Sequence, residues 1–107
     1  MKMLLAIINS DDAHSVMNHM MEAGFQITKL ATTGGFLRAG NVTILTGMED
    51  ARVQEAMDII RKYSTTRKQI IPTTAHLGAG FHPAMPVEVT VGGATVYVLN
   101  VEQFEKL

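Results

Sequence analysis

The chain contains no cysteine, and few of its 107 residues are charged. The absence of cysteine excludes a disulfide framework, a thiol nucleophile and a thiolate metal site. Charged residues make up 18% of the sequence and the formal net charge is −1, so there is no strongly basic composition of the kind that binds nucleic-acid polymers or acidic membranes. Composition therefore argues against the protein classes that depend on thiol chemistry or on a strong net charge.

Long hydrophobic runs are also absent. The apolar segment from Met3 to Ile8 is far shorter than the roughly 20 residues that a membrane-spanning helix needs, and no small-residue cleavage site follows it. We expect no membrane insertion and a cytoplasmic location. The apolar content of 47% is typical of an ordered globular protein, and the length predicts a single domain over residues 1–107.

Apolar periodicity divides the first part of the chain into strands and helices. The uninterrupted apolar run at residues 2–8 indicates a central strand buried on both faces. Polar residues at 9–12 are typical of a helix start, and Gly24 is typical of a helix end. We predict, in order, a strand at 2–8, a helix at about 12–23, strands at 25–33 and 41–47, and a second helix that opens at Glu49 and Asp50 and extends to about Tyr63.

The last third of the chain is rich in β-type residues. Residues 67–71 are a candidate short strand, and two runs at 87–91 and 94–99 flank Gly92-Gly93. This pattern predicts a C-terminal β-hairpin with a Gly-Gly turn, followed by a short helical turn at 101–107. The order β-α-β-β-α-β with that hairpin predicts an α+β, ferredoxin-like sandwich. Two helices cover only one face of such a sheet, so a symmetric oligomer with inward-facing sheets is the economical way to cover the other.

Residues suited to catalysis or metal binding form no recognisable site. His14 and His19 are five residues apart, which places them on different faces of a helix, whereas a metal-binding pair needs a spacing of three or four. We expect the histidines to be solvated or hydrogen-bonded. The acidic pairs at 11–12 and 49–50 are explained by the helix dipole, and no phosphate-binding loop or dinucleotide fingerprint occurs. We predict no catalytic residue, no metal ligand and no cofactor, and therefore a binding protein that is not an enzyme.

Packing explains the composition of residues 29–41 least well. Two adjacent glycines allow a second molecule to approach the main chain closely, and Phe36 offers a flat surface for a base. Arg38 and Asn41 offer hydrogen-bond donors for phosphate. These residue types favour a nucleotide site. A long hairpin with a Gly-rich tip accounts for the same composition, and the residue types alone do not separate the two interpretations.

Three segments of the sequence resemble one known family. They are Thr28-Lys-Leu-Ala-Thr-Thr-Gly-Gly-Phe-Leu-Arg-Ala-Gly-Asn41, Pro86-Val-Glu-Val and Val91-Gly-Gly-Ala-Thr-Val. Together they resemble the cyclic di-AMP receptors called PstA or DarA, a branch of the PII-like signal transduction proteins, and the resemblance covers nearly the whole chain. It implies a homotrimer of ferredoxin-like subunits that binds one cyclic di-AMP at each subunit interface. Two loops, a T-loop at about 33–41 and a B-loop at about 64–86, would rearrange on binding and change a surface that an unknown effector protein reads.

The resemblance also implies a set of binding residues. Where family members carry Asn-Phe-Arg, this chain has Gly24-Phe25-Gln26, and the glutamine keeps a hydrogen-bonding group but loses a charge. Thr28 and Asn41 would hydrogen-bond to adenine or phosphate, while Gly47 would keep the pocket floor low. The full set of expected ligand-binding residues is Gln26, Thr28, Gly35, Phe36, Leu37, Asn41, Gly47 and Tyr97.

Other interpretations of the same residues stay open. Leu37 and Tyr97 are also suited to filling a core or a subunit interface. A PII-like sensor of another adenine nucleotide, ATP or ADP, uses the same kinds of residue. A structural or interaction trimer without any small ligand is the alternative from a different class.

Overall fold

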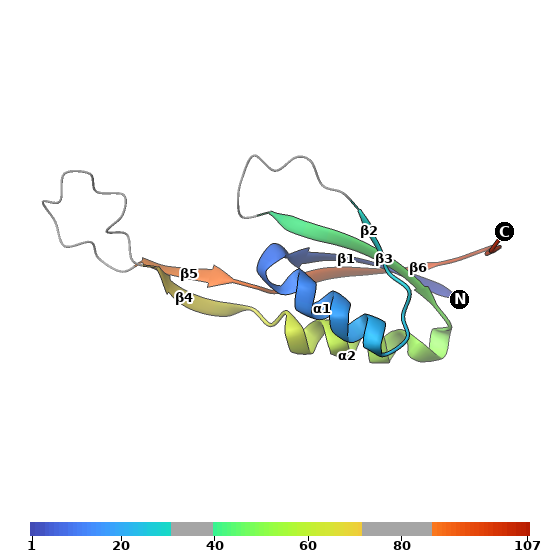
Figure 1. The fold of residues 1–107 in the computed structure, drawn as a ribbon, viewed down its shortest axis with the longest axis horizontal. Coiled ribbons are helices and arrows are strands. Elements are labelled where there is room, and N and C mark those ends of the chain that lie inside the picture. The colour runs from blue at the N-terminus through green and yellow to red at the C-terminus, as the bar shows by residue number, and fades with distance from the viewer. Residues whose placement is uncertain (31–39, 72–86) are drawn as a thin grey trace, which may run out of the picture.

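The computed structural model describes residues 1–30, 40–71 and 87–107, and in these residues it contains a four-stranded antiparallel sheet and two α-helices (Figure 1). The strand order β2-β3-β1-β6 is consistent with the predicted ferredoxin-like fold. Strands β4 and β5 form a separate two-stranded ribbon that extends away from the body. The elements are β1 (Lys2–Asn9), α1 (Ser10–Glu22), β2 (Thr28–Leu30), β3 (Asn41–Met48), the 3₁₀ turn η1 (Asp50–Arg52), α2 (Val53–Tyr63), β4 (Arg67–Ile71), β5 (Val87–Val91) and β6 (Ala94–Asn100).

The hydrophobic core lies between the helices and one face of the sheet. On β1, Leu4, Ala6 and Ile8 are completely buried and pack with core residues of both helices. The intervening residues Leu5 and Ile7 are only half-buried. Within a single chain β1 is therefore buried on one face only, and burial of its other face depends on the predicted oligomer and stays a prediction. An apolar run shows that a strand avoids water, but it does not show whether the cover comes from the same chain.

Helix α1 is delimited by local hydrogen bonds at both ends. At its start the Asn9 side chain accepts a hydrogen bond from the backbone N–H of Asp11 at 2.9 Å, which satisfies one free donor of the first turn. At its end Gly24 adopts a φ of 92°. The N–H groups of Gly24 and Phe25 bond back to the carbonyls of Met21 and Met20, which is a Schellman motif. The predicted polar start and glycine stop are both confirmed.

Arg52 joins the segment after α1 to the start of α2. Its guanidinium lies 4.0 Å from the centre of the Phe25 ring, and its Nη2 donates to the Ala23 carbonyl at 2.7 Å and to Glu55 at 3.0 Å. Phe25 itself is buried in the core. The predicted strand at 25–33 starts later than expected, at Thr28, and residues 31–33 of that prediction lie outside the described residues.

The C-terminal β-hairpin was predicted wrongly. Strand β5 pairs with β4, and β6 pairs with β1 at the edge of the main sheet. Gly92 and Gly93, both at a φ of 85°, carry the chain from one sheet into the other without reversing it. A Gly-Gly step permits either a tight turn or such a change of partner, and strand β4 takes the place that β6 would have occupied. Residues 101–107 form no helical turn, which corrects the last predicted element.

Candidate functional site

The face of the sheet opposite the helices carries half of the predicted binding residues. Residues that pair across antiparallel strands point to the same face, so the strand register defines its rows. Two rows cross all four strands. The rows run Thr28–Leu45–Leu5–Tyr97 and Leu30–Thr43–Ile7–Thr95, and beside them lies Gly47–Met3–Leu99.

This open face is apolar and accessible. Tyr97 is 55% exposed, Leu99 41% and Leu30 39%, although side chains of this size are normally buried. Half-buried Leu5 and Ile7 lie between them on β1. No described element of the chain packs on this face. A contiguous apolar surface of this kind marks a place where another molecule binds.

Four of the eight predicted binding residues lie on this face. Thr28, Asn41, Gly47 and Tyr97 belong to it by register, and all four are exposed. Gln26 is exposed in the segment just before β2. The predicted residues Gly35, Phe36 and Leu37 lie outside the described residues, as do most of the predicted T-loop and residues 72–86 of the predicted B-loop. Within the rest of that B-loop range, residues 67–71 form strand β4.

A single chain does not bring these four residues into one pocket. Thr28 and Tyr97 occupy the same row but lie on the two edge strands, three strand spacings or about 14 Å apart. Asn41 and Gly47 lie on the same strand, but six residues of extended chain separate them by about 20 Å. The structure therefore places Thr28 close to β3 and leaves Tyr97 at the opposite edge.

The surroundings of Gly47 and Asn41 differ. A Cβ atom at Gly47 would lie 3.2 Å from the Met1 methyl group, so a glycine keeps this part of the face low. Asn41 pairs with Asn9, which caps α1, and the neighbouring Gly40 carbonyl accepts a hydrogen bond from the Ser10 N–H at 3.1 Å. Asn41 is thus held beside the first turn of α1.

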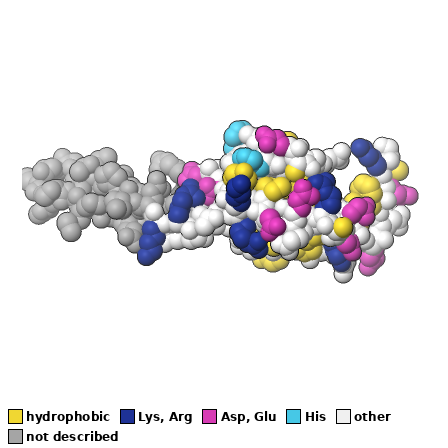
Figure 2. Space-filling model, turned by 90° about the horizontal axis from the view of Figure 1, so that it is seen from below, with side chains coloured by type: hydrophobic (Ala, Val, Ile, Leu, Met, Phe, Trp, Pro, Cys, Tyr) yellow, Lys and Arg dark blue, Asp and Glu magenta, His cyan; other side chains and the backbone are white. Residues whose placement is uncertain are grey.

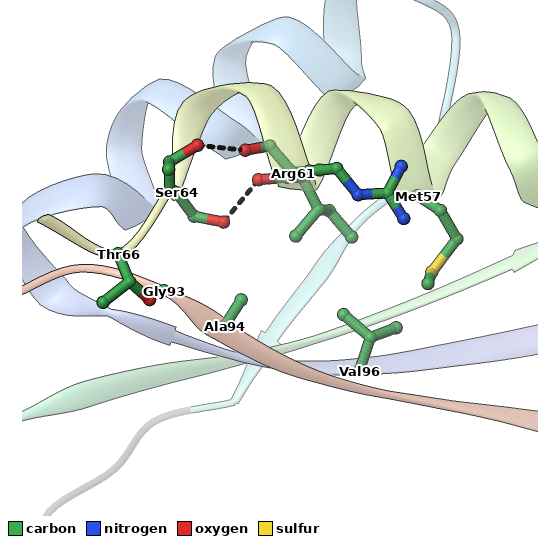
Figure 3. Close-up of a pocket in the computed structure, with 9 residues that line it drawn as sticks. Met57, Arg61, Ser64, Thr66, Gly93, Ala94 and Val96 are labelled. Carbon is green, nitrogen blue, oxygen red and sulfur yellow. Dashed lines mark hydrogen bonds between the residues drawn. The ribbon is translucent and has the colours of Figure 1, made fainter.

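Two recesses lie on the helix side of the molecule, and none of the described residues that line them was predicted from the sequence. One, of about 450 Å³, lies between the end of α2 and strand β6 (Figure 3). Ser64 and Thr65 are part of its wall, but their hydroxyls donate to the carbonyls of Ile60 and Arg61 and so cap the helix. The sequence signal for this corner is the run of three hydroxyl residues that follows α2. The lining residues are Met57, Ile60, Arg61, Ser64, Thr65, Thr66, Gly93, Ala94 and Val96.

The second recess, of about 510 Å³, lies on the outer side of α1 and α2. His19 stacks on Tyr63 there, with ring centres 3.6 Å apart, and its Nδ1 lies 2.7 Å from the Ser15 carbonyl oxygen. Figure 2 shows acidic and basic side chains interspersed over the side on which α2 lies. Pairs such as Arg61 with Asp58, at 2.9 Å, account for this mixture. The helix side therefore presents no surface of a single charge.

The described histidines serve structural contacts. His14 Nε2 lies 3.1 Å from the Asn18 side-chain amide, and His19 makes the contacts given above, so the expectation of hydrogen-bonded histidines is confirmed for these two. His76 and His82 lie outside the described residues. Within the described ranges, no three His, Asp or Glu side chains are close enough to share a metal ion.

Comparison with known proteins identifies relatives over the whole chain. The model of a family described as cyclic-di-AMP receptor matches residues 1–107. The crystal structure of a functionally unknown protein from Pediococcus pentosaceus is similar at 40% identity and a TM-score of 0.77, over 99% of this chain and 96% of that one. Among the described residues, neither helix has the length and apolar character needed to cross a membrane.

Proposed function

We propose, because this chain belongs to the cyclic-di-AMP receptor family, that it binds cyclic di-AMP and acts as a non-enzymatic signalling protein. The observation that carries the proposal is the family match over residues 1–107, because it extends through every element that presents the open face. A receptor is a binding protein, and this agrees with the absence of a recognisable catalytic motif in the sequence.

We further propose that the binding unit is a homotrimer with its ligand sites between subunits. Two observations support this assembly. The open face carries apolar residues on all four strands, and burying it against other subunits would stabilise an oligomer. Thr28 and Tyr97 lie on opposite edges of the sheet, so a ligand reaches both most simply when β6 of one subunit adjoins β2 of the next.

Recognition in this proposal uses a few polar groups around an apolar surface. Asn41 and Thr28 would offer hydrogen bonds to an adenine edge or to phosphate, Gly47 leaves room for the ligand, and Tyr97 provides an aromatic contact. Gln26, Gly35, Phe36 and Leu37 complete the proposed set. Rearrangement of the T-loop and the B-loop would then alter the surface presented to an effector protein.

The direct test is titration calorimetry of the purified protein with cyclic di-AMP, with ATP, ADP and cyclic di-GMP in parallel. Preferential binding of cyclic di-AMP would support the proposal. Preferential binding of ATP or ADP would replace it with the alternative of another adenine-nucleotide sensor. If none of the four nucleotides binds to a protein shown to be oligomeric, the sensor proposal is wrong and the structural trimer takes its place.

Gln26 allows a sharper test of where the ligand lies. The substitution Gln26→Arg adds a charge beside β2 and should strengthen cyclic di-AMP binding by roughly tenfold, because an arginine–phosphate hydrogen bond is charge-assisted. The matched control is Gln54→Arg, which adds the same charge on the exposed side of α2. Equal effects of the two substitutions would show only a general charge effect and would place the ligand away from Gln26.

A further inference from the structure

The first turn of α1 contains a carboxylate bound to the ribbon. Asp12 is only 6% exposed, and its two oxygens accept hydrogen bonds from the two terminal nitrogens of Arg67 at 3.0 and 3.2 Å. Arg67 is the first residue of β4. The hydrogen bond to Asp12 and the charge of that carboxylate raise the pKa of Arg67 above its ordinary value. A bidentate pair of this kind fixes direction as well as distance.

The other strand of the ribbon also meets this ion pair. Gly92 directly follows β5, and a Cβ atom there would lie 2.6 Å from Arg67 Nη1, 2.7 Å from the Thr65 carbonyl oxygen and 3.0 Å from Asp12 Oδ2. Such distances leave no room for a side chain. Arg67 also pairs with Val91 in the ribbon register. Both strands of the ribbon are therefore packed, at their base, against one carboxylate of α1.

The same helical turn holds the segment that enters β3. The Ser10 N–H donates to the carbonyl of Gly40, the residue just before β3, at 3.1 Å. Ser10 and Asp12 lie in a single turn of α1, and Figure 1 shows that the ribbon and β3 both begin near this end of the helix. One rigid turn thus contacts two segments that are far apart in the sequence.

We propose that Asp12 is a positioning residue that fixes the ribbon through Arg67 and couples it, through the first turn of α1, to the segment entering β3. A hydrogen-bonded helical turn moves as a unit, so a displacement of Gly40 is transmitted to Arg67. This last step rests on the proposed function: in a receptor that binds its ligand at Asn41, the junction would carry the displacement caused by binding from Asn41 to the ribbon.

The test is backbone amide hydrogen exchange of the full chain without ligand, for the natural protein and Asp12→Asn. We expect amide exchange in β4 and β5 to accelerate about tenfold or more, because a charged hydrogen bond is lost from a nearly buried site. The Ser10 amide should accelerate with them, while the amides between β1 and β3 keep their natural rates. The matched control is Asp11→Asn, which removes a charge of the same sign from an exposed position in the same turn. The Asp11 charge contributes least to the raised pKa of Arg67, so this variant should change both rates far less than Asp12→Asn.

Further variants separate positioning from general stability. Arg67→Gln should reproduce the Asp12→Asn pattern without altering α1, and it carries the test if Asp12→Asn does not fold. Asp12→Glu keeps the charge and should restore most of the protection of the ribbon. The proposal is overturned if the ribbon or the Ser10 amide keeps its natural exchange rate in Asp12→Asn and Arg67→Gln, or if Asp11→Asn produces the same acceleration.

A second arm adds cyclic di-AMP. If binding changes ribbon exchange in the natural protein, that change should fall severalfold in Asp12→Asn while the affinity stays within about threefold, since Asp12 belongs to the junction and not to the proposed binding set. An undiminished ribbon response would overturn the coupling. Failure of the natural protein to bind would overturn the proposed function instead, while the ligand-free comparison still decides the junction.

Discussion

The two faces of the four-stranded sheet are built from similar side chains but differ in what covers them. Leu4 and Ile8 on the helix face are completely buried, whereas Leu5 and Ile7, their neighbours along β1, are half-buried on the open face. Aliphatic composition is therefore the same on both sides of this strand. On the helix face the helices cover the central strand and leave Val98 exposed only on the edge strand β6, whereas the open face is apolar without a described cover, which is the physical argument for an assembly of several chains.

The largest expected effect comes from substitutions on β1 that compare the covered helix face with the open face. Leu4→Ala should lower the free energy of unfolding by about 2 to 5 kcal/mol, because it leaves a cavity in the core. Leu5→Ala removes the same atoms from the open face and should cost less than half as much in dilute solution. Urea denaturation at low protein concentration measures both. Equal losses would show that the open face is buried within the single chain.

The next effect concerns the base of the ribbon, on the helix side. Gly92→Ala should lower the free energy of unfolding by up to about 3 kcal/mol, because the new methyl group adds steric overlap to an unfavourable backbone angle. Gly24→Ala is the matched control, since Gly24 also has a positive φ but has only Arg52 Nη1 nearby, at 3.9 Å. Its cost should be about 1 kcal/mol. A Gly92→Ala variant no less stable than Gly24→Ala would contradict the close packing at this junction.

A charge on the open face should disturb assembly more than folding. Tyr97→Lys should weaken self-association roughly 30-fold or more, because it would place an ammonium group in a proposed subunit interface. Gln54→Lys adds the same charge on the helix side and should leave association unchanged. Analytical ultracentrifugation over a dilution series compares the two. If Tyr97→Lys associates over the same concentration range as the natural protein, this face is not part of the interface.

The smallest expected effect concerns the N-terminal end of β1, a strand that contributes side chains to both faces of the sheet. The amino group of Met1 lies 2.9 Å from Asp50 Oδ1, and this hydrogen bond holds the pKa of Asp50 below its ordinary value. A lowered carboxylate pKa adds stability above the unfolded pKa, and this stability is lost as the pH falls through the folded pKa. As the pH is lowered from about 5 to about 2, the urea denaturation midpoint of Asp50→Asn should therefore fall slightly less than that of the natural protein. Identical acid profiles would show that this exposed pair adds nothing.

Local signals in the sequence predicted the elements well. The Asn9 cap, the Gly24 stop and the strand at 67–71 depend on residues close together in the chain, and all three are confirmed. The ferredoxin-like order followed from these elements. Apart from the helical turn predicted at residues 101–107, which the structure does not contain, the main failure is long-range. The Gly92-Gly93 step looked like a hairpin turn because the sequence does not show that β4, some twenty residues earlier, pairs with β5.

The candidate site shows the same division between local and distant information. The sequence placed Thr28, Gly47 and Tyr97 on strands, but only the sheet order shows that Tyr97 is on the opposite edge from Thr28. Asp12 was interpreted from its position in the first turn of a helix, where the helix dipole explains an acidic residue. Its ion pair with Arg67 spans 55 residues and has no local signal. All eight binding residues stay predictions, since the structure tests only where the described ones lie.

The attachment of the ribbon to the body has a geometric consequence. Residues 64–66 before β4 and the Gly92-Gly93 step after β5 join its base to the rest of the chain, so any tilt of the ribbon would pivot at this base. Five extended residues reach about 17 Å from that pivot, so a rotation of about 10° would carry the far end of the paired strands through about 3 Å. Asp12 binds Arg67 at the base of the ribbon, close to this pivot. A small tilt at this base would therefore become a larger displacement at the far end of the paired strands, without any change in the pairing of β4 with β5.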